Sequence, residues 1–173
     1  MLSRKLKASI VGLLAAGLIA CTPSQIQTSE SLITVILQDV PPILTMLAGF
    51  GVLAQPQLTQ AQAAAGQASA DFSLALSLIK QYQATPSTTT AQKIQATLGD
   101  AQTNLNAILT AAHALNPQSR DQITGAVTLI INTASQIAAV FPTVATTSAV
   151  KASNAIKLPS ANSFQKQFHA YIP

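Results

Sequence analysis

Apolar residues recur at intervals of three and four along most of the chain, and this is the period of an α-helix. The stripe with the fewest exceptions comprises Ile94, Leu98, Ala101, Leu105, Ile108, Ala112 and Leu115. Similar stripes run through residues 33–47, 58–82 and 123–141, and no strand-like alternation persists. We therefore predict an all-α protein, an up-down bundle of about four helices joined by short links.

Turn residues divide these stripes into separate helices. Pro56 suits the first turn of a helix, and the polar loop 85–90 ends that helix. Thr89 with Gln92 matches a capping box for the next helix. Asn116-Pro117 combines a good N-cap with a good first residue, so the helices on either side of it are predicted to be antiparallel neighbours.

Residues 32–54 are the most apolar stretch beyond the first 20 residues, but Pro41-Pro42 interrupts it. Proline lacks an amide donor and disfavours a helical residue before it, so this first bundle helix is predicted to be kinked or broken near Val40. The stretch suits either a core helix in two pieces or a hairpin that dips into a membrane. Asp39 favours the core helix, because a charge in hydrocarbon costs about 2.5–3.5 kcal/mol.

The first 20 residues follow another pattern. Arg4, Lys5 and Lys7 precede thirteen uncharged residues, 8–20. A helix of that length rises about 20 Å, which is short of the ~30 Å hydrocarbon core of a bilayer. A basic start and a short apolar run that ends in small residues are typical of a secretory signal peptide, so we expect residues 1–20 to form a signal helix that is cleaved off.

The apolar run ends in Leu18-Ile19-Ala20-Cys21, which resembles the lipobox of bacterial lipoproteins. Ala20 matches the small residue before the scissile bond, and Cys21, the only cysteine, matches the residue that is acylated. The resemblance implies cleavage before Cys21, a diacylglyceryl thioether on its sulfur and a fatty acyl group such as palmitate on its new amine. The alternative is a buried thiol behind an ordinary signal peptide.

Lipidation at Cys21 would hold the chain at a membrane, because two or more acyl chains give stable attachment. Thr22 stands where an Asp retains many Gram-negative lipoproteins at the inner membrane. The resemblance therefore implies the outer membrane, facing the periplasm, if the organism is Gram-negative. Residues 21–31 are predicted to form a polar lipidated tether, and residues 32–158 the helical bundle.

The charge of the chain argues against a nucleic-acid partner. The net charge of +4 includes three basic residues of the signal, and the remainder has six basic and five acidic residues. The six are scattered and form no patch able to neutralise several phosphates, so we expect no nucleic-acid partner. Charged residues make up 8% of the chain against about 25% in typical domains, which leaves neutral polar faces. Such faces suit either lateral self-association or an ordinary monomer of biased composition.

The search for catalytic chemistry finds little. His113 and His169 each lack a second ligand at helical spacing, so both are predicted to be surface or capping residues rather than metal ligands. The five acids are widely spread, and Asp39 is either a buried carboxylate with a perturbed pKa or an exposed acid on a polar helix face. We expect no catalytic residues, no metal and no cofactor, and the protein is predicted not to be an enzyme.

The C-terminal segment 159–173 is predicted to be an amphipathic tail. Phe164, Phe168 and Tyr171 fall on one face of a short helix. This face either packs across the bundle or serves as a docking face for a partner protein or a membrane.

Together these features predict a membrane-anchored bacterial lipoprotein with a non-enzymatic structural or protein-interaction role in the cell envelope. Its partners would be the lipid bilayer, through acylated Cys21, and either an unknown envelope protein or a second copy of itself. Two alternatives are a bundle that binds an apolar ligand in a closed cavity between its helices, and a small membrane-active protein that uses residues 32–54.

Overall fold

The computed structural model describes residues 21–49, 55–142 and 155–172, and the predicted signal helix and Ala20 lie outside these ranges. The described residues form helices and no strand, which confirms the all-α prediction. The helices are α2 (Pro23–Gly49), α3 (Gln55–Ala84), α4 (Thr88–Ala112), α5 (Pro117–Val140) and α7 (Ala161–Tyr171).

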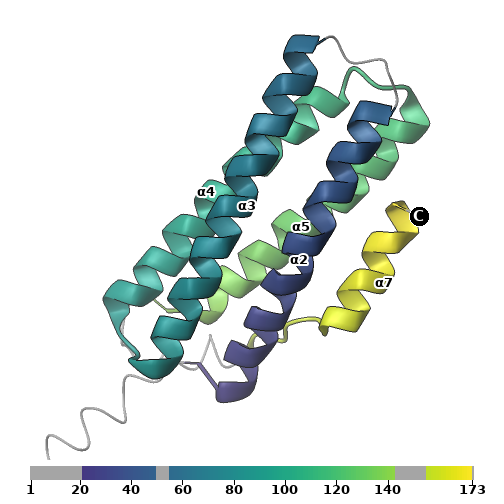
Figure 1. The fold of residues 1–173 in the computed structure, drawn as a ribbon. Coiled ribbons are helices and arrows are strands. Elements are labelled where there is room, and N and C mark those ends of the chain that lie inside the picture. The colour runs from purple at the N-terminus through teal and green to yellow at the C-terminus, as the bar shows by residue number, and fades with distance from the viewer. Residues whose placement is uncertain (1–20, 50–54, 143–154, 173) are drawn as a thin grey trace, which may run out of the picture.

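Helices α2, α3, α4 and α5 form an up-down bundle in which each helix packs against the next along the chain (Figure 1). The contact between α3 and α4 is the most extensive, and α2 and α5 contact each other much less. The short helix α7 contacts both α2 and α5 and so covers the seam between them.

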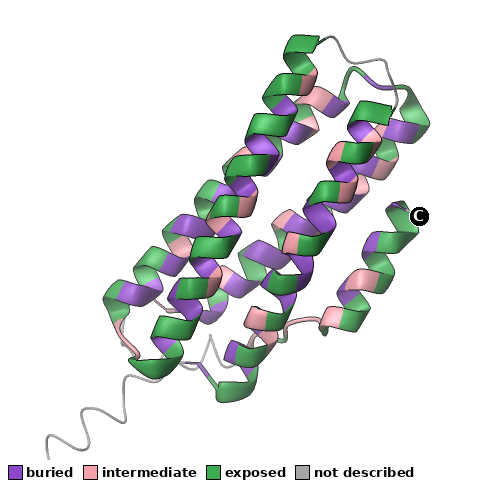
Figure 2. Ribbon diagram, viewed as in Figure 1, coloured by how far each residue is buried: buried purple, intermediate pink, exposed green. Residues whose placement is uncertain are grey.

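The predicted stripes form the core, and the buried residues line the inward faces of the helices (Figure 2). The seven apolar positions predicted from Ile94 to Leu115 are all buried. Small residues line α3, where Ala61, Ala65, Ala68 and Ala75 are fully buried. Because alanines let a neighbouring helix approach closely, they fit the extensive contact between α3 and α4.

The start of α2 corrects the predicted domain boundaries. Helix α2 begins at Pro23, so most of the segment 21–31 is helical and is not a polar tether. Thr22 and Gln25 form a capping box, in which the Thr22 amide donates to Gln25 Oε1 at 3.0 Å and the Gln25 amide donates to Thr22 Oγ1 at 3.3 Å. This reciprocal cap, together with Pro23 at the first helical position, starts the helix nine residues earlier than predicted.

Helix α2 also continues through Pro41 and Pro42, so the alternative of a core helix is confirmed, but its predicted break into two pieces near Val40 is wrong. The buried residues Val40, Ile43 and Leu47 extend the apolar face across the prolines. Packing of this face therefore outweighs the loss of two backbone hydrogen bonds.

Capping signals in the sequence predict two further helix starts. Asn116 caps α5 as predicted, and its Oδ1 accepts a hydrogen bond from the Ser119 amide at 3.0 Å. For α4 the predicted cap at Thr89 is wrong, because Ser87 is the N-cap and its Oγ accepts from the Thr90 amide at 3.1 Å. Thr89 and Thr90 both lie inside α4.

Candidate functional site

The Cys21 side chain lies against the end of the bundle where α2 begins and α5 ends. It is 1% exposed, and its thiol donates a hydrogen bond to the backbone oxygen of Val140 at 3.0 Å. The Tyr82 side chain also interacts with the sulfur, and the Tyr82 ring meets Phe141 edge to face at 5.3 Å. The ends of three helices therefore meet around Cys21.

Burial raises the pKa of the Cys21 thiol from 9.0 to about 11, and the hydrogen bond with Tyr82 opposes part of this rise. A thiol with this pKa is neutral near pH 7 and is a weak nucleophile. The packed site consequently has the properties of a structural cysteine rather than a catalytic one. The enclosed sulfur also has no room for a diacylglyceryl group, so acylation requires the Cys21 side chain to turn out of the bundle.

The raised pKa predicts slow thiol chemistry at Cys21 in the unmodified chain. Cys21 should react with iodoacetamide about a hundredfold more slowly in the folded than in the unfolded chain near neutral pH, because its thiolate fraction is about a hundredfold lower. Stability from the neutral thiol should be complete below pH 9 and decline as the pH rises towards 11. Mass spectrometry of timed alkylation, with a urea-unfolded control, measures the rate; equal rates would contradict the burial of Cys21.

The tail residues Phe164 and Phe168 are both fully buried, and their rings stack at 6.2 Å. The predicted docking face is therefore wrong for these two residues, because the bundle itself covers them. Tyr171 is 40% exposed, but a side chain at Gly125 would collide with its ring, so the ring lies directly on α5. The alternative of a tail packed across the bundle is confirmed.

Of the two alternatives for Asp39, the buried carboxylate is confirmed, because the residue is only 5% exposed. Its Oδ2 atom has no hydrogen-bond partner among the described residues. Burial raises the pKa of Asp39, and the charge of His169 on α7 opposes that rise. A buried carboxylate oxygen without a hydrogen-bond partner costs stability. His113 and His169 are exposed, as predicted for surface residues.

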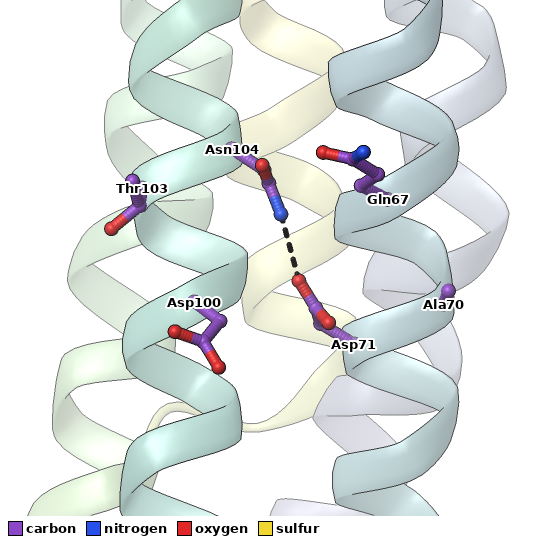
Figure 3. Close-up of a pocket in the computed structure, with 6 residues that line it drawn as sticks. All are labelled: Gln67, Ala70, Asp71, Asp100, Thr103 and Asn104. Atoms are coloured by element: carbon purple, nitrogen blue, oxygen red, sulfur yellow. Dashed lines mark hydrogen bonds between the residues drawn. The ribbon is translucent and has the colours of Figure 1, made fainter.

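The fold brings two acids together that the sequence spacing did not predict. Asp71 on α3 and Asp100 on α4 line an open groove of about 340 Å³ with Gln67 and Asn104 (Figure 3). The Asn104 amide donates to Asp71 Oδ2 at 2.8 Å, which fixes the orientation of that carboxylate. No group of three or more metal-ligating His, Cys, Asp or Glu residues exists in the described part of the chain. The groove provides polar contacts from two carboxylates, two amides and the Thr103 hydroxyl.

Two other open grooves flank α7. One of about 380 Å³ lies between the first turns of α2 and of α7, and one of about 420 Å³ lies beside Tyr171 and Gly125. Hydroxyl and amide residues are the most frequent residues along both grooves. None of these grooves is the closed apolar cavity that an apolar ligand between the helices requires.

Helices α2 and α5 are both long and apolar enough to cross a membrane by length and composition. Core helices of soluble proteins meet the same criterion. In α2 the apolar residues Leu32, Ile33 and Ile36 are fully buried, whereas Ser31, Thr34 and Gln38 are exposed. The apolar character of α2 is thus accounted for by the bundle core.

Comparison of the chain with protein-family models, with curated proteins and with solved structures finds no match.

Proposed function

We propose that this chain is a membrane-anchored bacterial lipoprotein whose helical bundle has a non-enzymatic structural or protein-interaction role in the cell envelope. The observation that carries the proposal is the position of Cys21. It follows a basic and then apolar N-terminal segment, and every helix that the structure describes lies after it. Cleavage before Cys21 would remove none of the described fold.

The buried thiol is compatible with acylation on energetic grounds. Only Thr22 separates Cys21 from α2, so rotation about the Thr22 backbone can move Cys21 outward without unwinding the helix. The loss of one small buried side chain and its two weak hydrogen bonds, with Val140 and Tyr82, costs about 2–3 kcal/mol. Each methylene of an acyl chain that enters the bilayer contributes about 0.8 kcal/mol, so a few methylenes outweigh that loss.

A bundle without a described catalytic constellation suits a role in contacts. Polar neutral residues cover much of its exterior, and Leu74 and Tyr171 are the exposed large apolar residues among those described. Such a surface supports contacts through hydrogen bonds rather than through an apolar patch. The polar groove between α3 and α4, in which Asn104 holds the Asp71 carboxylate, is one surface for such contacts.

Intact mass measurement of the full-length gene product, extracted from bacterial membranes, tests the proposal. We expect a chain that begins at Cys21 and carries a diacylglyceryl group, usually with an N-acyl group. Cys21→Ala should lose the lipid mass entirely, whereas the neighbouring Thr22→Ala should keep it. A native protein that begins at Met1 with a free thiol would overturn the proposal.

A further inference from the structure

The capping box at Thr22 brings the bundle close to its anchor. One residue separates Cys21 from helix α2, so a lipid on Cys21 would hold the end of the bundle within about 7 Å of the point of attachment. A ten-residue tether would have allowed a separation of roughly 30 Å or more. With such an anchor, the end of the bundle near Cys21 would lie at the height of the lipid headgroups.

The fold brings three exposed lysines that are scattered in the sequence to this end of the bundle. Lys80 lies four residues before the end of α3, and Lys93 lies five residues after the start of α4. At about 1.5 Å per residue, both lie within roughly 8 Å of the end. Lys157 lies beside Thr22 at the rim of a groove. None of the three lysines forms an ion pair with another described residue.

Most of the acidic residues lie far from the Cys21 end of the bundle. By the same helical rise, four of the five acids lie about 18 Å or more from the Cys21 end, namely Asp39, Asp71, Asp100 and Asp121. Glu30 is the exception at about 10 Å, and it is half-buried. The bundle thus has a basic end at its predicted anchor and an acidic remainder.

We propose that the Cys21 end of the bundle, with Lys80, Lys93 and Lys157 at its rim, binds the anionic headgroups of the membrane and holds the bundle upright on it. The proposal rests on the proposed lipidation of Cys21. Charges within a Debye length of about 8 Å of an anionic surface are attracted to it, and each lysine strengthens the association about fivefold. The lysines need no partner protein for this contact, because the anchor itself brings the headgroups to them.

A fluorescence experiment on the lipidated protein can measure this contact. The chain has no tryptophan, so a single introduced tryptophan reports on one position. Gln83→Trp lies at the exposed end of α3 near Cys21, and His113→Trp lies at the exposed far end of α4. The purified protein would be reconstituted in phosphatidylcholine vesicles with or without phosphatidylglycerol, and a headgroup spin label would serve as quencher.

We expect stronger quenching of Gln83→Trp when phosphatidylglycerol is present, and no such change for His113→Trp. Adding K80E and K93E should weaken docking about twenty-five-fold or more and remove the effect of phosphatidylglycerol. The control R120E with K166E makes the same change in net charge away from the Cys21 end and should leave the effect intact. High salt should also suppress it.

The outcomes distinguish the headgroup contact from the lipid anchor on which it rests. If the protein floats with the vesicles but Gln83→Trp is quenched equally with and without phosphatidylglycerol, the headgroup contact is refuted and the lipid anchor stands. The headgroup contact is likewise refuted if both pairs of charge reversals act alike. If the native protein does not float with vesicles of either composition, the lipid anchor is refuted, and the headgroup contact with it.

Discussion

Replacing Phe168 by alanine is expected to lower the free energy of unfolding by about 3–5 kcal/mol. The Phe168 ring is fully buried, stacks on Phe164 and fills the seam between α2 and α5. Its removal deletes a large apolar side chain and leaves a cavity that short α7 cannot close. A domain of this size has about 5–15 kcal/mol of stability, so the loss is a large share of it.

Thermal unfolding followed by circular dichroism measures this effect. In a domain of about 150 residues each kcal/mol shifts the melting temperature by roughly 2–4 °C, so Phe168→Ala should lower it by about 10 °C. Gln167→Ala changes the exposed neighbour and should have almost no effect. An unchanged melting temperature in Phe168→Ala would mean that α7 is not part of the core, and would restore the tail as a docking peptide.

The regular parts of the fold could be predicted because they follow from local signals. Stripes of period 3.6 identify a helix wherever one face is buried, and Asn116-Pro117 marks a helix start by its own chemistry. The start of α2 has such a signal too, because Thr22 and Gln25 stand at capping-box spacing. The polar composition of residues 22–31 is equally typical of a tether, and it obscures that signal in the sequence.

Features of the site depended on contacts between distant residues and could not be predicted. Cys21 is buried because the end of α5 and the Tyr82 side chain close over it, at a separation of 119 residues in the case of Val140. Asp39 lies near His169 on α7, which is 130 residues away in the sequence. Asp71 and Asp100 meet across the hairpin of α3 and α4, whose register a helical period does not specify.

Cys21 has a packed position in the structure, and the proposed anchor requires an outward position. In the packed position the sulfur is enclosed, which an unacylated chain would favour. In the lipidated protein the same residue would turn outward, and the Val140 backbone oxygen would lose the thiol as a donor. Because Val140 is the last residue of α5, its oxygen lies at the bundle end, where water can replace the thiol once Cys21 has left. Outward rotation would thus move Cys21 and Thr22 and would break the contacts of Cys21 with Val140 and Tyr82.

Replacing Pro41 and Pro42 together by alanine is expected to raise the free energy of unfolding by about 2 kcal/mol or more. Both prolines lie inside α2, where each removes a backbone hydrogen bond and crowds the preceding turn. Alanine restores the two amide donors and has the highest helix propensity. The gain is smaller than the cost of two interior prolines, because proline also restricts the unfolded chain by about 0.4–1 kcal/mol per residue.

Urea unfolding of this double variant and of Pro117→Ala compares prolines inside a helix with a proline at a helix start. Pro117 occupies the first position of α5, where its missing amide has no helical acceptor, so Pro117→Ala should be neutral or slightly destabilising. A loss of stability in the double variant would contradict the expectation. It would show that α2 needs a bend at Pro41-Pro42 to pack against α3 on one side and α7 on the other, and that this bend is worth more than two hydrogen bonds.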